Sequence, residues 1–276
     1  MTSATFAEAV RFAWRWIASM LAFVVFGLGG LALGMLVFPL VALTTASPAQ
    51  RISRRRRLLQ GVFRLYLRLL SVMGAASFSF TGDPRQGSYL IVANHPTLID
   101  AVLLLTLFPQ ADCIVKQELL RNPFIRFALS GLDYMSNADT ADMLEAAIAR
   151  LRSGRSVLVF PEGTRSLPGQ PVNFHLAAAT LAVRSGARCL PVLICCEPVT
   201  TSKQARWYEI ADEKPHFTVH VDPPLDPAPI VGARAPRYAK RVLNEFLQGY
   251  YNRRLAEIRP QPASAIREAG QYSPQA

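Results

Sequence analysis

Acidic residues are scarce in this sequence. Nineteen Asp and Glu face 30 Lys and Arg, which gives a formal net charge of +11 at pH 7. Such an excess favours an anionic surface or an acidic partner. The surplus arginines lie beside apolar segments and form no nucleic-acid-binding motif. We therefore expect a membrane surface or an acidic carrier protein as the partner, and no nucleic acid.

Cysteine is also scarce, and its placement excludes several kinds of site. The spacing fits neither a metal site nor a disulfide framework, so no metal is predicted. All four cysteines lie in apolar runs, which is typical of core thiols in a reduced compartment. A Gly-x-Ser-x-Gly nucleophile elbow is missing as well. The four are Cys113, Cys189, Cys195 and Cys196.

Charge is absent altogether from residues 16–50. A bilayer-spanning helix needs about 20 apolar residues, and this stretch is longer than that. It is also too long for the apolar core of a signal peptide. Glycines and a proline within it leave two readings open, one tilted span or a re-entrant hairpin. Those residues are Gly27, Gly29, Gly30, Gly34 and Pro39.

Arginines gather directly after the uncharged stretch. Arg51 and residues 54–57 follow it, whereas only Arg11 and Arg15 precede it. By the positive-inside rule, this asymmetry predicts that the rest of the protein faces the cytoplasm. We expect a protein attached to a membrane, of the bacterial inner-membrane type.

Residues 51–74 predict a basic amphipathic helix. Arg57, Arg64 and Arg68 share one stripe, and leucines and aromatic residues supply apolar area. Such a helix suits the membrane interface, although an ordinary helix packed on the domain fits the same pattern. The chain thus divides into a transmembrane or re-entrant segment at 1–50 and an interfacial helix at 51–74.

Residues 75–258 predict an α/β domain. Apolar strands alternate with helices, which favours a mixed, mostly parallel sheet flanked by helices on both faces. Residues 259–276 are rich in Pro, Gln, Ser and Ala and predict a disordered tail. The expected strands are 75–81, 89–93, 113–116, 156–160, 189–196 and the pair 207–210 and 216–221; the expected helices are 98–108, 124–129, 140–152, 174–184 and 236–258.

The first candidate site lies at a predicted strand-to-helix turn. Pro96 breaks the apolar run, Thr97 is the expected N-cap, and Asp100 falls in the first turns of the next helix. His95 can then bond back to the Asp100 carboxylate. Such a carboxylate fixes the imidazole tautomer and stabilises the protonated ring, which suits a general base. The alternative is a partly buried histidine with an aspartate favoured by the helix dipole.

A second candidate site, residues 160–166, follows another predicted strand. Pro161 fixes one backbone angle, and Gly163 permits a positive φ. Glu162 and Arg165 are thereby held at the carboxyl end of a strand, where open α/β sheets bind ligands. Arg165 suits a phosphate or carboxylate. The alternative is a surface turn with a weak local ion pair.

Together, Asn94–Asp100 and Phe160–Ser166 resemble the lysophospholipid acyltransferase family, typified by 1-acylglycerol-3-phosphate acyltransferase. Residues 116–119 and 122–124 resemble its middle motif, and residues 190–194 its late proline-containing strand. The resemblance implies a glycerolipid acyltransferase-like fold with N-terminal membrane-associated helices.

The resemblance also implies an activity. An acyl group would pass from acyl-CoA or acyl-carrier protein, as cosubstrate without any other cofactor, to a hydroxyl of a lysophospholipid or related membrane lipid. His95 and Asp100 would be catalytic. The substrate-binding residues implied are Asn94, Lys116, Glu162, Gly163, Thr164 and Arg165. A catalytically inactive lipid- or carrier-binding module and an acyl-thioester hydrolase remain as alternatives.

Two stretches depart from the family pattern. Residues 132–137 lack its usual basic residue, and residues 174–177 read Phe-His-Leu-Ala where many members have Phe-Lys-x-Gly. Both changes weaken positions suited to phosphate. We therefore hypothesise that the acceptor is not simply lysophosphatidic acid.

Overall fold

The computed structural model describes residues 3–84, 87–201, 206 and 208–258. The helices are α1 (Ser3–Ala32), the π-helical segment η1 (Leu33–Val37), α2 (Phe38–Leu43), α3 (Pro48–Val72), α4 (Asp100–Leu107), α5 (Gln117–Arg121), α6 (Pro123–Ser130), α7 (Thr140–Arg152), α8 (Ala177–Ser185), α9 (Pro227–Val231) and α10 (Pro236–Ile258). The strands are β1 (Ser77–Gly82), β2 (Leu90–Ala93), β3 (Asp112–Val115), β4 (Met135–Ser136), β5 (Val157–Val159), β6 (Cys189–Glu197) and β7 (His216–Val221).

The strands form one seven-stranded sheet in the order β1-β7-β6-β2-β5-β3-β4. The strands from β6 to β4 run parallel to one another, and β7 pairs antiparallel with β6. The predicted mixed, mostly parallel sheet is therefore confirmed. Because the central strands are parallel, the loops that follow β2, β5, β3 and β6 meet at one edge of the sheet.

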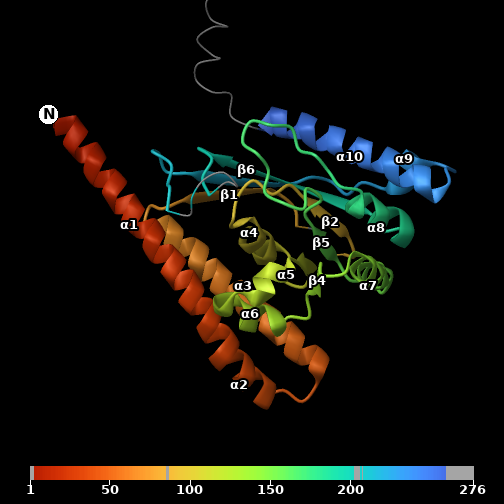
Figure 1. The fold of residues 1–276 in the computed structure, drawn as a ribbon, viewed down its shortest axis with the longest axis horizontal. Coiled ribbons are helices and arrows are strands. Elements are labelled where there is room, and N and C mark those ends of the chain that lie inside the picture. The colour runs from red at the N-terminus through yellow and green to blue at the C-terminus, as the bar shows by residue number, and fades with distance from the viewer. Residues whose placement is uncertain (1–2, 85–86, 202–205, 207, 259–276) are drawn as a thin grey trace, which may run out of the picture.

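Helices cover both faces of the sheet, as Figure 1 shows with α9 and α10 on one side and α3 and α4 on the other. Strand β2 shows why both faces are needed, because all four of its residues are buried. Ile91 and Ala93 pack in the core shared with α1, α3 and α4, while Leu90 and Val92 pack in the core shared with α7, α8 and α10. Alternate side chains of a strand point to opposite faces, so this strand must be apolar throughout.

Two local expectations were wrong. Thr97 is not the N-cap of α4, which begins at Asp100 with Ile99 in the N-cap position. Residues 208–210 are not a strand, because the backbone N–H of Glu209 closes a turn on the carbonyl of Arg206 at 3.0 Å. Strand β7 pairs with β1 and β6 instead. Trp207 and the predicted tail at 259–276 lie outside the described residues.

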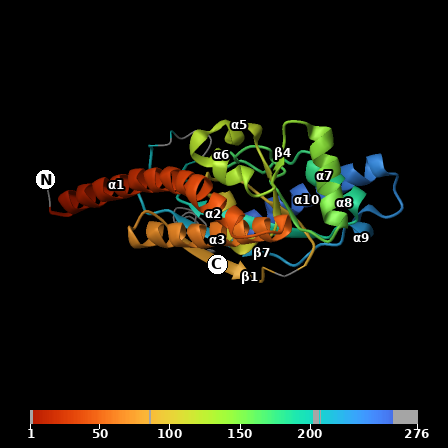
Figure 2. The same cartoon turned by 90° about the horizontal axis from the view of Figure 1, so that it is seen from below.

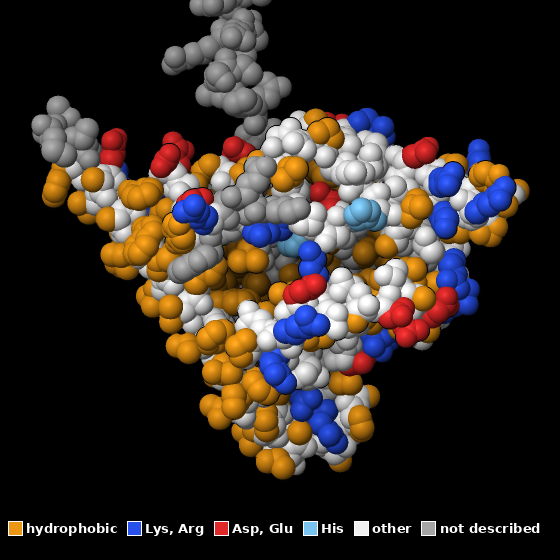
Figure 3. Space-filling view, in the orientation of Figure 1, with side chains coloured by type: hydrophobic (Ala, Val, Ile, Leu, Met, Phe, Trp, Pro, Cys, Tyr) orange, Lys and Arg blue, Asp and Glu red, His pale blue; other side chains and the backbone are white. Residues whose placement is uncertain are grey.

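The N-terminal segment forms a helical hairpin. The helical run from α1 through η1 and α2 ends at Leu43, and α3 returns along α1 after a short turn (Figures 1 and 2). Within the described residues, Phe6–Leu43 is the one helix long and apolar enough to cross a membrane. Only 17% of its most apolar stretch is buried, unlike a soluble core helix. Figure 3 shows hydrophobic side chains along the edge formed by α1 and α2.

The glycines of the uncharged stretch do not break the helix. Gly27, Gly30 and Gly34 let α6 pack closely against α1 and η1 instead. A Cβ atom at Gly34 would lie 2.5 Å from the Phe127 carbonyl carbon, and one at Gly30 would lie 2.8 Å from the Phe124 carbonyl oxygen. The bend of the hairpin falls at residues 44–47, after the glycines.

The close packing of α6 against α1 and η1 predicts opposite effects for two glycine substitutions. Gly34→Ala should destabilise the protein by about 1–3 kcal/mol, because the methyl group meets backbone atoms that cannot move aside. Gly29→Ala should stabilise α1 by about 0.5–1 kcal/mol, because nothing lies within 4 Å of its Cβ position and alanine favours helix. Thermal unfolding in detergent measures both. Equal shifts in Tm would contradict the packing.

Candidate active site

The turn after β2 is shaped by the side chain of Asn94, which is buried. Its Nδ2 donates to the Ile194 carbonyl at 2.8 Å, and its Oδ1 accepts from the Ile194 N–H at 2.7 Å. The amide thus continues the pairing of β2 with β6 after the backbone of β2 turns away. Its role as a substrate ligand stays a prediction, since these atoms already hold the turn.

Tyr251 fills a gap in the same pair of strands, and sequence reasoning missed it. Pro191 sits opposite Val92 in the register of β6 and β2 and has no N–H to donate. The Tyr251 hydroxyl, from α10, donates to the Val92 carbonyl and accepts from the Val192 N–H at 3.1 Å. The strand that leads into the turn is therefore held in place despite a proline beside it.

The Asp100 carboxylate is fully buried and accepts three hydrogen bonds. His95 Nδ1 lies 2.7 Å from Oδ2, the Thr97 N–H donates to Oδ2 at 2.7 Å, and the Thr97 hydroxyl donates to Oδ1 at 2.5 Å. Thr97 therefore fixes the carboxylate and does not cap the helix. Because a carboxylate only accepts, His95 carries its proton on Nδ1 and leaves Nε2 able to accept one. The ring keeps 21% of its surface exposed.

The second motif, residues 160–166, hydrogen-bonds to the backbone of the first motif at His95. Glu162 Oε1 accepts from the His95 N–H at 2.9 Å and from the Ser166 hydroxyl at 2.7 Å, while the Ser166 N–H donates to the His95 carbonyl at 2.7 Å. The Phe160 ring stacks on the imidazole at 4.4 Å between centroids. Glu162 is buried, and this burial raises the pKa of its carboxyl despite the two donors. No pattern in the sequence points to Ser166 as a partner of His95.

The rest of the second motif lies beside His95 and is more exposed. Gly163 has φ +64°, as its turn requires, and the His175 ring lies 3.2 Å from its Cβ position. Arg165 Nη1 donates to the Thr201 carbonyl at 2.6 Å, which fixes its guanidinium near the start of α4. Thr164 and Arg165 are half-buried. These residues line the same edge of the sheet as His95.

Lys116 lies at this edge too, directly after β3, and its side chain is exposed. Strand β5 separates β3 from β2, so Lys116 stands two strands away from His95. Parallel strands are about 4.8 Å apart, which puts the two backbones roughly 10 Å apart across the edge. The site thus brings together the His95 imidazole, the buried carboxylates of Asp100 and Glu162, and two cationic side chains.

A small apolar cavity of about 70 Å³ opens beside this site. It lies between the N-terminal hairpin and the residues around Ile99 and Thr201, so it joins the start of α4 to the apolar helices. Its other apolar lining side chains include Phe23, Tyr66, Leu70 and Phe217.

Other candidate groups carry no site. Among the described residues, no group of three or more His, Cys, Asp or Glu side chains is placed to hold a metal ion. All four cysteines are buried, and burial raises the pKa of the Cys113 thiol to about 12. A thiolate nucleophile is thus disfavoured. His216 and His220 lie on β7 and bond to hydroxyls of β1.

One of the two departures from the family pattern, residues 132–137, runs from one edge of the sheet to the other along β4. Asp133 contacts Arg150 and Arg155 at the edge where β3 and β5 begin. Asn137 lies at the carboxyl edge, where its Oδ1 accepts from the Gln117 N–H at 2.9 Å, next to Lys116. His175, from the other departure, lies beside the turn at Gly163.

The fold and site define an α/β protein with a His–Asp pair at the carboxyl edge of a mostly parallel sheet. Residues 80–195 match the family model described as Acyltransferase. The predicted resemblance to 1-acylglycerol-3-phosphate acyltransferases is confirmed. That match contains both motifs.

Relatives and a solved structure agree with this assignment. A 1-acyl-sn-glycerol-3-phosphate acyltransferase of Borreliella burgdorferi is 30% identical over 40% of this chain and 47% of its own length. The human 1-acyl-sn-glycerol-3-phosphate acyltransferase alpha is 27% identical over 79% of this chain and 76% of its own. The crystal structure of the Thermotoga maritima 1-acyl-sn-glycerophosphate acyltransferase PlsC superposes with a TM-score of 0.69 at 20% identity, covering 91% of this chain and 99% of that one, and shows the same fold. The match spans less than half the length of the Borreliella protein and 30% of an Arabidopsis thaliana relative that is 32% identical.

The hydrogen bonds that Glu162 accepts from His95 and Ser166 predict different outcomes for two Glu162 variants. Glu162→Ala leaves the buried N–H of His95 and the Ser166 hydroxyl without an acceptor, which costs about 1–3 kcal/mol. Glu162→Gln keeps an acceptor oxygen and should cost less. Exposed Glu145, which pairs with Arg184, is the control, and its alanine variant should change stability by less than about 1 kcal/mol. Equal Tm values for the two Glu162 variants would contradict the claim that these hydrogen bonds hold the two motifs together.

Proposed function

We propose that the protein is a membrane-attached O-acyltransferase that moves a fatty acyl group from a thioester to a hydroxyl of a lysophospholipid. The observation that carries this proposal is the bond between His95 and the buried Asp100, with Nε2 free to take a proton. The match of residues 80–195 to the Acyltransferase family model supports the reaction class.

His95 has a defined part in the proposed reaction. An alcohol, like water, has a pKa far above neutral and attacks poorly while it keeps its proton. His95 Nε2 accepts that proton as the hydroxyl oxygen bonds to the thioester carbonyl carbon. The C–S bond then breaks, and the departing sulfur takes the proton back from His95. The products are an ester and a free thiol. Asp100 stabilises the protonated ring between these steps.

The cationic side chains at the site suit an anionic acceptor. Arg165 is held by the Thr201 carbonyl, and Lys116 stands two strands away at the same edge. A phosphate headgroup satisfies both charge and geometry at a guanidinium. The names of the relatives favour lysophosphatidic acid itself as the acceptor. The apolar cavity at Ile99 and Thr201 suits part of a hydrocarbon chain.

The donor is acyl-CoA or an acyl-carrier protein, and both carry the thioester that the mechanism needs. The basic surface of the chain, with a net charge of +11, suits either donor because both are acidic. The proposed membrane attachment is through the apolar N-terminal hairpin, and the arginines at 51 and 54–57 favour the cytoplasmic side. This places the site where a soluble thioester and a membrane lysolipid meet.

Substitution of the pair tests the proposal. His95→Ala should lower acyl transfer by about 10²–10⁴-fold, because the hydroxyl loses its proton acceptor. Asp100→Asn should also lower transfer strongly, because the amide can favour the wrong tautomer of His95. His220→Ala is the matched control and should leave transfer unchanged. The measurement is mass spectrometry of lipids after incubation with an acyl thioester and a panel of lysolipids.

The same assay separates the alternatives. Release of free fatty acid at the same rate with and without lysolipid would favour a hydrolase. Binding of lysolipid without any transfer in the unchanged protein would favour an inactive binding module. Transfer that survives in His95→Ala would rule out the proposed mechanism.

A further inference from the structure

A second and larger cavity, of about 910 Å³, lies at the sheet edge opposite His95. It is bounded by the first half of α3, the end of α4 and the starts of β3 and β5. Ile91 of β2 lines it and lies four positions before His95, which corresponds to about 13 Å of extended chain. The volume is within the usual range of ligand pockets, about 300–1,000 Å³. The cavity is therefore separate from the proposed catalytic site.

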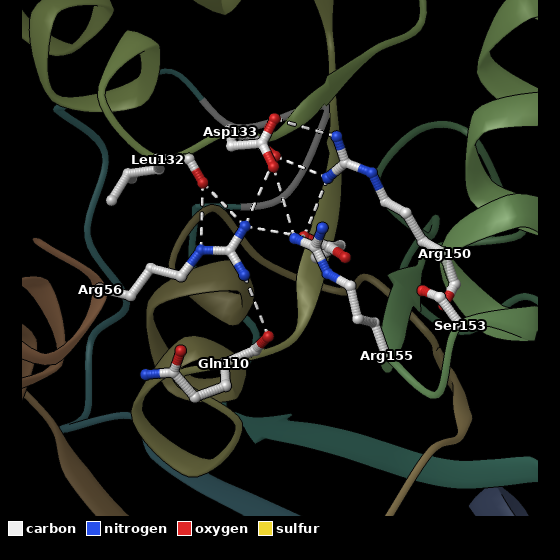
Figure 4. Close-up of polar contacts among 8 residues, drawn as sticks. Arg56, Gln110, Leu132, Asp133, Arg150, Ser153 and Arg155 are labelled. Atoms are coloured by element: carbon white, nitrogen blue, oxygen red, sulfur yellow. Dashed lines mark hydrogen bonds and ion pairs between the residues drawn. The ribbon is translucent and has the colours of Figure 1, made fainter. Parts of the chain in front are cut away.

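One wall of this cavity carries a cluster of arginines. Arg56, Arg150 and Arg155 all donate to Oδ1 of Asp112, which is fully buried. Arg150 and Arg155 also pair with Asp133. Figure 4 shows the three guanidinium groups converging between Asp133 and the carbonyls of Leu132 and Gln110. Three guanidinium groups against two carboxylates leave the cluster with one positive charge in excess.

Arg155 presents that charge to the cavity. Its Nη2 is taken by Asp112 and Asp133, whereas Nε and Nη1 have no hydrogen-bond partner among the residues that the structure describes. Its side chain is 40% exposed and lines the cavity. The carboxylates hold the guanidinium in one orientation, so its remaining donors are fixed before any ligand arrives. An oxyanion is the ligand that such a guanidinium edge binds best.

The other wall of the cavity is apolar. Ile52 from α3, Ile91 from β2, and Leu107 and Phe108 from the end of α4 form it. A small anion cannot use this surface, whereas an amphiphile with an anionic head can contact both walls. Helix α3 also belongs to the N-terminal hairpin, and it exposes Leu65 to the outside. Lipids of a membrane that holds the hairpin are therefore the nearest amphiphiles.

We propose that this cavity binds one anionic phospholipid, with its phosphate at Arg155 and part of a chain along Leu107 and Phe108. The lipid is not the acyl acceptor, because this cavity lies at the opposite end of β2 and α4 from His95. It connects α3 to the starts of the strands and so fastens the membrane hairpin to the domain. This site goes beyond the proposed function, and of that function it rests only on the attachment of the hairpin to a membrane.

The test uses the full chain, purified and stripped of lipid in detergent. Native mass spectrometry counts bound phosphatidylglycerol and phosphatidylcholine with identical chains, and inorganic phosphate is the soluble probe. We expect one tightly bound phosphatidylglycerol, with a Kd at least about tenfold lower than that of phosphatidylcholine. Inorganic phosphate should bind more weakly still, because it leaves the apolar wall uncovered.

Three variants locate the bound lipid. Arg155→Gln should raise the Kd for phosphatidylglycerol by about tenfold or more, while Arg152→Gln should not. Arg152 is the matched control because it lies at the end of α7, bonds to the Arg184 carbonyl and does not line the cavity. Leu107→Trp fills the apolar wall and leaves the arginine cluster intact, so it should also weaken binding even if Arg155→Gln does not fold.

The site and the catalytic proposal can fail separately. His95→Ala should keep the bound phosphatidylglycerol while losing transfer. Equal affinity for phosphatidylcholine, or inorganic phosphate binding as tightly as the lipid, would overturn the phospholipid site. Unchanged phosphatidylglycerol binding in a folded Arg155→Gln or in Leu107→Trp would overturn it as well.

Discussion

The buried carboxylate of Asp100 is the group on which the site depends. It accepts from His95 and twice from Thr97, so both of its oxygens are fixed and its negative charge is compensated by donors in an apolar core. A buried carboxylate without such partners would cost several kcal/mol. The turn at residues 95–97 therefore has to bring the donors of His95 and Thr97 to this carboxylate. The same turn fixes the tautomer and direction of the imidazole.

The surrounding fold keeps this turn in register. Strands β2 and β5 are parallel neighbours, so the two motif loops meet at one edge, and Glu162 and Ser166 bind the backbone of His95 directly. Asn94 and Tyr251 hold the end of β2 against β6, where Pro191 interrupts the ladder. The N-terminal hairpin packs, through α3, on the face of α4 that points away from the sheet. It thereby joins an apolar surface suited to a membrane to the site.

Local patterns in the sequence predicted much of this arrangement. The apolar run before Asn94 and the breaks at Pro96 and Gly163 predicted two loops at a sheet edge, and the five-residue spacing of His95 and Asp100 predicted their bond. The contact of Ser166 with His95 and the contacts of Tyr251 with β2 and β6 could not be predicted, because they join residues 59 to 159 positions apart. Thr97 was misjudged because one hydroxyl can cap a helix or hold a carboxylate, and sequence does not separate these uses. The packing of the hairpin glycines could not be predicted either, because their partner, α6, lies far along the chain.

The most direct test of the account is nitrogen NMR of the His95 imidazole in ¹⁵N-histidine-labelled protein, assigned by comparison with His95→Ala. We predict a neutral ring protonated at Nδ1, with Nε2 giving the shift of an unprotonated nitrogen, and a change of that pattern in Asp100→Asn. A ring protonated only at Nε2 in the unchanged protein would contradict the account, because that nitrogen could then accept no proton from a lipid hydroxyl.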